Sequence, residues 1–214
     1  MHALKTTLTV PSDETVLEAE FGLYIYSHMS RDQLSALLES QGAFVEQNKM
    51  LFFIRLLDEK DLDSIQSMFM REDATRLPWY FNNYVAQNVS DDPCYYFTHH
   101  FLINNDKSDW FHLLQPLFKM LKPVGDVKHF IRIKGNMYPS TPKIVYHDPH
   151  VDISWQHKGA IFYVNTNNGV TVLEDGTEIE SIENRLLLFD SSKEHNSTSC
   201  TDAKVRVNIN FNYF

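Results

Sequence analysis

The chain has 214 residues, of which 43% are hydrophobic, so it can bury a sizeable core and is not disordered as a whole. Its net charge of −9 argues against a general binder of nucleic acid or of anionic membranes. With two cysteines, no signal-peptide pattern and no apolar run of about 18 residues, it is expected to be cytoplasmic and to bind no membrane.

Three segments of the first half have the apolar spacing of helices. The first is "SRDQLSALLESQG", residues 30–42, which begins at the N-cap candidate Ser30. The second is "DLDSIQSMF", residues 61–69, and the third spans residues 108–126. We expect a bend at Pro116 in the third helix, because an interior proline kinks a helix. The apolar positions of these helices are predicted to pack in the core.

The second half has a different pattern, with short strands and turns following each other after about residue 127. The aromatic-rich segments 78–85 and 94–102 before it are predicted to be strands or a lid. Asp175-Gly176 predicts a type I′ hairpin turn. Further strands are expected in the segments "HFIRIKGNMY", "GAIFYVN", "NRLLLFD" and "AKVRVNINFNYF". The first of these alternates, which predicts one polar face made of Arg132, Lys134, Asn136 and Tyr138.

These patterns favour one domain over residues 1–214, with a supporting region at 1–127 and a catalytic core at 128–214. The expected fold class is α+β, mainly β in the C-terminal half. Many short strands with regular turns suggest a sandwich or jelly roll.

The final strand alternates strictly between apolar and polar residues. Side chains two apart on a strand share a face, so the two sets should lie on opposite sides of a sheet. The apolar set is Val205, Val207, Ile209 and Phe211, and the polar set is Arg206, Asn208, Asn210 and Asn212.

The segment "YHDPHVD", residues 146–152, contains two histidines and two aspartates. In an extended backbone, His150 and Asp152 lie on one face, whereas the neighbours His147 and Asp148 do not. His150 and Asp152 are therefore the candidate metal ligands. We expect His147 and Asp148 to lie in a loop or to support the site.

A third ligand is offered by His195, which follows the strand "NRLLLFD". Two histidines and one carboxylate suit a non-haem Fe(II) site that activates O₂, and they can also hold zinc in a hydrolase. Arg206 lies eleven residues further on, on the polar face of the last strand. A guanidinium inside a sheet sandwich requires an anion, such as one end of a dicarboxylate.

The pattern His150, Asp152, His195 and Arg206 resembles the 2-oxoglutarate- and Fe(II)-dependent oxygenases, in the branch similar to prolyl 4-hydroxylases. The likeness covers roughly residues 128–214, and "PWY" in the first half resembles virus-encoded members. Many prolyl 4-hydroxylases have lysine at the distal basic position, where this chain has arginine. The family resemblance implies the more specific architecture, a double-stranded β-helix (jelly roll) with the N-terminal helices packed on one sheet.

The resemblance implies that His150, Asp152 and His195 bind Fe(II) and that Arg206 binds the far carboxylate of 2-oxoglutarate. It also implies a tyrosine beside this cosubstrate, for which Tyr138 is the first candidate and Tyr163 the second. The reaction would consume O₂ and 2-oxoglutarate, hydroxylate a C–H bond, and release succinate and CO₂.

The expected substrate is a protein or peptide side chain, with proline the leading candidate. The nucleic-acid demethylase branch would be expected to carry a second arginine where this chain has Asn212, so a nucleic-acid substrate is not expected. The alternatives are a free amino acid or other small metabolite as substrate, a non-catalytic jelly-roll binding module, and a zinc hydrolase.

Four further residues near these motifs are expected to have structural roles. Arg132 is predicted to form a structural ion pair, and Cys200 is predicted to be a packing thiol. Trp155 and His157 are expected in a surface loop, with a position at the substrate entrance as the alternative.

Overall fold

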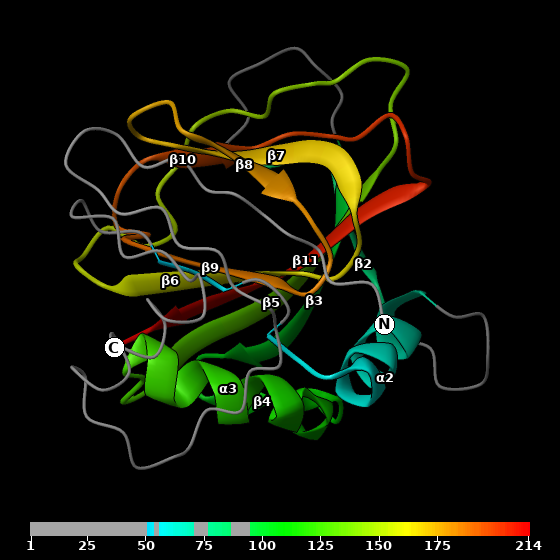
Figure 1. The fold of residues 1–214 in the computed structure, drawn as a ribbon. Helices are drawn as coiled ribbons and strands as arrows, with labels where there is room; N and C mark the ends of the chain where they lie inside the picture. Colours follow the sequence, from blue (N-terminus) through cyan, green and yellow to red (C-terminus); the bar gives the residue numbers. More distant parts are fainter. Residues whose placement is uncertain (1–50, 54–55, 71–76, 87–94) are drawn as a thin grey trace, which may run out of the picture.

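The structure, a computed structural model, describes residues 51–53, 56–70, 77–86 and 95–214. It has three layers: a small sheet faces a large sheet, and helices cover the outer side of the large sheet (Figure 1). The helix predicted at residues 30–42 lies outside the described residues. Within the described residues, no helix has the length and apolar character needed to cross a membrane.

The large sheet combines strands from both halves of the chain, all paired antiparallel. Its order is β1 (Leu51–Phe53), β9 (Arg185–Phe189), β6 (Lys158–Tyr163), β11 (Val205–Tyr213), β5 (Phe130–Pro139), β3 (Tyr96–Ile103) and β2 (Tyr80–Asn82), and β4 (Asp106–Lys107) pairs with β3. The small sheet has the order β10 (His195–Ser197), β7 (Asn167–Leu173) and β8 (Glu178–Ser181).

The helices α2 (Glu59–Met70) and α3 (Gln115–Gly125) lie on the outer side of the large sheet (Figure 1). The helix predicted within 61–69 is confirmed. The single bent helix predicted at 108–126 is wrong: a 3-10 turn, η1 (Phe111–Leu114), precedes α3, and Pro116 lies in the first turn of α3. Proline is tolerated there because the first N–H groups of a helix have no partner within it.

The main core lies between the helices and the large sheet, as the apolar spacing predicted. Ile65 of α2 and Leu121 of α3 are fully buried in the same cluster as Ile209 and Phe211 of β11. The polar side chains of β11 take the opposite face, towards the small sheet, and are also buried. The strict alternation of the last strand therefore separates an apolar layer from a polar interior.

The hairpin between β7 and β8 forms, but its turn differs from the predicted type I′. Only Gly176 has a positive φ, 84°, and the amide of Gly176 donates to the carbonyl of Leu173 at 2.8 Å. The loop thus has three residues, 174–176, with glycine in the left-handed position of a bulged turn. The Asp-Gly pair predicted the hairpin correctly, while the turn type was wrong.

Asn184 joins the N-terminal part of the chain to the start of β9. Its side-chain oxygen accepts from the amide of Leu57 at 2.8 Å, and its side-chain nitrogen donates to the carbonyl of Leu57 at 2.7 Å. The residue has a φ of 61° and is buried. It therefore combines a left-handed backbone with two buried hydrogen bonds.

We expect Asn184→Ala to lower the free energy of unfolding by about 2–4 kcal/mol, since it strains the left-handed backbone and leaves two groups of Leu57 without partners. Urea unfolding followed by circular dichroism measures this. The matched control is Asn105→Ala, at an exposed position with a φ of 67°, which should lose only about 1 kcal/mol from backbone strain. Equal losses in the two variants would show that the bonds to Leu57 contribute nothing.

Candidate functional site

The structure brings His150, Asp152 and His195 together between the two sheets. His150 and Asp152 lie in the segment joining β5 to β6, and His195 is the first residue of β10. One candidate ligand atom from each residue lies within 4.8 Å of the others. The Nε2 atom of His195 is 3.8 Å from Oδ2 of Asp152. This spacing allows all three groups to bind one metal ion.

The backbone holds the two histidines in register. The amide of His150 donates to the carbonyl of His195, and the amide of His195 donates to the carbonyl of His150, each at 3.0 Å. The ring centroids are 4.8 Å apart. The backbone pairing thus places the two imidazoles side by side.

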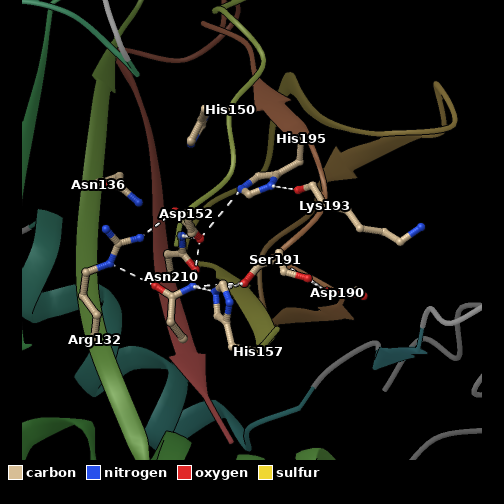
Figure 2. A network of polar contacts seen from close by, with 12 residues as sticks. Arg132, Asn136, His150, Asp152, His157, Asp190, Ser191, Lys193, His195 and Asn210 are labelled. Atoms are coloured by element: carbon tan, nitrogen blue, oxygen red, sulfur yellow. Dashed lines mark hydrogen bonds and ion pairs between the residues drawn. The ribbon is translucent and has the colours of Figure 1, made fainter. Parts of the chain in front are cut away.

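Both imidazoles are oriented through their Nδ1 atoms. His195 Nδ1 donates to the carbonyl of Lys193 at 3.0 Å (Figure 2), and His150 Nδ1 donates more weakly to the carbonyl of Asp148 at 3.4 Å. These bonds leave Nε2 of each ring as the available lone pair. Burial, followed by the neighbouring His195, lowers the pKa of His150 to about 4, so that imidazole is neutral at pH 7.

The carboxylate of Asp152 receives hydrogen bonds from three side chains of the large sheet. The guanidinium of Arg132 on β5 donates to Oδ1 at 2.5 Å. Asn210 and Asn212 on β11 donate to Oδ2 at 2.9 and 2.8 Å. Figure 2 shows Arg132 and Asn210 directed at this carboxylate. The prediction that Arg132 forms a structural ion pair is thereby confirmed.

Burial alone would raise the pKa of the Asp152 carboxyl, because it penalises the charged form. The positive charge of Arg132, the neighbouring His195 and Lys134, and the hydrogen bond from Asn212 act in the opposite direction and outweigh it. The pKa of Asp152 is therefore held well below its usual range. The group is a carboxylate at any pH at which the protein would work.

His157 belongs to this network, and the expectation that it lies in a surface loop is wrong. Its side chain is buried, and its Nε2 lies 2.7 Å from Oγ of Ser191 and 3.2 Å from Nδ2 of Asn212. Asn212 in turn contacts Asp152. Trp155 is 45% exposed and stacks on Phe214, as expected for a surface residue. One sequence signal for the network was available, the position of Asn210 and Asn212 on the polar face of the last strand.

Arg206 lies fully buried on the same face of β11. Its Nε donates to Oγ of Ser181 at 2.8 Å, and its Nη2 donates to Oγ1 of Thr171 at 3.0 Å. Its Nη1 is buried and makes no hydrogen bond in the part of the chain that the structure describes. Gly169 makes room for the side chain, because a Cβ there would lie 2.6 Å from Cδ of Arg206. An anion reaching Nη1 would complete the bonding of this guanidinium.

Both candidate tyrosines pack against Arg206, at 5.4 Å for Tyr138 and 6.0 Å for Tyr163 from ring centroid to guanidinium carbon. The hydroxyl of Tyr163 donates to Oγ1 of Thr171 at 2.9 Å. Tyr138 lines the cavity described below. His147 stacks on Tyr138 and hydrogen-bonds to Ser197, so it supports the site and is absent from the three-residue group, as expected.

A cavity of about 190 Å³ lies between the sheets, beside Tyr138 and the candidate metal ligands. Its wall on β5 consists of the alternate residues Arg132, Lys134, Asn136 and Tyr138, the face predicted from the sequence to be polar. The opposite wall includes Thr171 of β7 and the residues of β10. The three candidate metal ligands line the same cavity. A ligand bound there could contact a metal ion and the polar residues of both sheets.

We expect Asp152→Asn to destabilise the metal-free protein by about 2–3 kcal/mol at pH 7, because it removes the negative partner of the half-buried Arg132. A carboxyl whose pKa falls on folding contributes its full stabilisation above its unfolded pKa, near 3.9, and loses it progressively as the pH falls from there through the lower folded pKa. The stabilities of wild type and variant should therefore begin to converge below about pH 4. Urea unfolding in chelator from pH 7 to 3 tests this, and a constant difference would contradict it.

No family model matches the sequence, and no curated protein matches it. Solved structures do match. A prolyl hydroxylase from Trichoplax adhaerens, in complex with a peptide of the hypoxia inducible factor oxygen degradation domain, has a TM-score of 0.56 at 15% identity, covering 78% of this chain and 84% of that one. A 2OG-Fe(II) oxygenase family protein from Burkholderia pseudomallei has a TM-score of 0.57 at 11% identity, covering 89% and 93%.

HygX from Streptomyces hygroscopicus, with nickel, 2-oxoglutarate and hygromycin B bound, has a TM-score of 0.52 at 12% identity, covering 86% of this chain and 87% of that one. At these identities the likeness concerns the fold. It confirms the predicted jelly roll with helices on one sheet, and it confirms the resemblance to the oxygenases at the level of the fold. The chain has the fold of the 2-oxoglutarate- and Fe(II)-dependent oxygenases.

Proposed function

We propose that the protein is an Fe(II)- and 2-oxoglutarate-dependent oxygenase that hydroxylates a C–H bond of its substrate. The observation that carries this proposal is a pair of groups at one cavity. The cluster of His150, Asp152 and His195 lines the cavity. Arg206, whose Nη1 has no hydrogen bond within the described residues, lies buried against the lining residues Tyr138 and Thr171. The first suits a metal ion, and the second suits the far end of an anionic cosubstrate.

The three ligands fit Fe(II) by their chemistry. His150 and His195 each offer Nε2, Asp152 offers a carboxylate oxygen, and such a set leaves coordination positions for a cosubstrate and O₂. Fe(II) bound there would supply the activation of O₂. The chain orients both imidazoles through backbone carbonyls and holds the Asp152 carboxylate with Arg132. These contacts fix the ligand atoms in direction and protonation state.

The polar end of the cavity fits 2-oxoglutarate. One end of the dicarboxylate would lie at the metal, and the other would accept hydrogen bonds from Arg206 Nη1 and from the hydroxyl of Tyr138. A charge-assisted bond of this kind is stronger than a neutral one and compensates for the burial of the guanidinium. Tyr138 is favoured over Tyr163 because Tyr138 lines the cavity and Tyr163 is not among the lining residues.

A zinc hydrolase and a non-catalytic binding module remain as competitors of this function. Zinc could bind the same three ligands, but a hydrolase would leave the buried Arg206 without a role. A binding module would not require two imidazoles arranged around a carboxylate. The oxygenase accounts for both groups with one metal and one cosubstrate.

For the substrate, we propose a protein or peptide side chain, with proline as the leading residue. The Trichoplax adhaerens prolyl hydroxylase, which has the same fold, was solved with a peptide. A small molecule is the second candidate, supported by HygX, which has the same fold and was solved with hygromycin B. Asn212, which contacts Asp152, stands where a nucleic-acid demethylase would be expected to have a second arginine.

We expect the purified protein with Fe(II) to convert 2-oxoglutarate slowly into succinate even without its substrate. Asp152→Ala should abolish this conversion because the metal loses one of three ligands. Succinate is measured by mass spectrometry, with an anaerobic visible spectrum to detect the Fe(II)–2-oxoglutarate chelate. A folded wild type that binds Fe(II) but gives neither succinate nor the chelate band would favour the binding module.

We expect Arg206→Met to raise the dissociation constant for 2-oxoglutarate at least about thirtyfold, since truncating one partner of a buried charge pair costs about 2–5 kcal/mol. Affinity for the metal should change little, because Arg206 contacts none of its ligands. Calorimetric titration of each ligand measures both constants. The control Arg185→Met, at a partly buried arginine paired with Glu180, should leave both unchanged. Parallel losses of metal and cosubstrate in Arg206→Met would contradict the assigned role.

A further inference from the structure

The cavity wall contains one cation that neither the metal nor the cosubstrate accounts for. Lys134 lies on β5 between Arg132 and Asn136, which flank the site in Figure 2, and it lines the cavity. Arg132 is paired with Asp152. The ammonium of Lys134, in contrast, has no acceptor within the described residues, and its nearest recorded contact is the ring of Tyr96 at 5.8 Å.

Lys134 is half-buried at the cavity wall, so its ammonium is partly desolvated. Burial, and next the positive charge of Arg132, lower the pKa of Lys134 to about 8, with Asp152 acting in the opposite direction. The amine is thus still mostly protonated at pH 7. His100, opposite Lys134 in the register of β3 and β5, leaves its own buried Nδ1 without a partner. Two adjacent polar groups therefore lack partners at this wall.

The sum of the charges at the site also favours an anion beside Lys134. Arg132 and Asp152 cancel each other, and Fe(II) and 2-oxoglutarate carry opposite charges of equal size. Lys134 and Arg206 then remain as an uncompensated positive excess. This excess is two charges, and of the two residues Lys134 is the one that lines the cavity and has no hydrogen-bond acceptor within the described residues. Such a charge favours a ligand that brings an anion.

We infer that the substrate carries a carboxylate and that Lys134 binds it, so that the reacting carbon is placed beside the metal ligands. This inference rests on the proposed oxygenase function and narrows its substrate class. Two kinds of substrate could supply this carboxylate. One is a free amino acid, through its own carboxylate, and the other is a peptide with an acidic side chain next to the hydroxylated residue. An ammonium on a flexible stem acts as a point charge and suits either source.

The test uses the protein loaded with Mn(II) and saturating 2-oxoglutarate, and it measures the paramagnetic relaxation of probe protons by NMR. The probes are matched pairs that differ only in charge: acetate with acetamide, L-proline with L-prolinamide, and the capped dipeptides Glu-Pro and Gln-Pro. In wild type, we expect at least one carboxylate probe to bind about tenfold or more tightly than its amide partner. Tighter binding of L-proline than of L-prolinamide would identify a free amino acid as the substrate class. Tighter binding of Glu-Pro than of Gln-Pro would identify a peptide.

Lys134→Met should remove the preference for the carboxylate, while Lys134→Arg should retain most of it. Lys143→Met, at an exposed lysine away from the cavity, serves as the control and should behave as wild type. Affinity for 2-oxoglutarate should be the same in Lys134→Met as in wild type. A fall in that affinity with the carboxylate preference intact would assign Lys134 to the cosubstrate and overturn the inference.

Two other outcomes separate this inference from the function on which it rests. A loaded wild type that binds each carboxylate no better than its amide would overturn the inference and leave the oxygenase intact. A wild type that takes up neither Mn(II) nor 2-oxoglutarate would overturn the proposed function and the inference together.

Discussion

The burial of one carboxylate governs the arrangement of the site. Asp152 is enclosed between the sheets, where an unpaired negative charge would be prohibitively costly. Arg132 from β5 and two asparagines from β11 surround it. These two strands are neighbours at the middle of the large sheet. The position of the carboxylate is thus set by the most rigid part of the fold, although Asp152 itself lies outside the strands.

Much of this arrangement could be predicted from the sequence because it depends on period-two alternation. The last strand, β11, places Arg206 and the asparagines on one of its faces. By the same alternation, β5 places Arg132 and Tyr138 on one of its faces. The spacing of His150 and Asp152 also follows this rule. The choice of His195 as the third candidate metal ligand depended on the resemblance to a known family, since 45 residues separate His195 from His150.

The features that escaped prediction arise from contacts between distant segments. The burial of His157 depends on Ser191 and Asn212, and nothing near His157 in the chain indicates either partner. Pro116 lies in the first turn of α3 because a separate 3-10 turn precedes this helix. The spacing of apolar residues does not indicate such a break. Lys134 was placed on the polar face, but its lack of an acceptor is visible only once β3 and β5 are paired.

The paired amides of His150 and His195 have a consequence for the thermodynamics of metal uptake. The paired backbones hold the two residues side by side, and the Nδ1 bonds to the carbonyls of Lys193 and Asp148 restrict the orientation of the rings. Less conformational entropy is then lost when an ion binds than for two histidines on unpaired loops. This preorganisation would strengthen the binding of a metal ion.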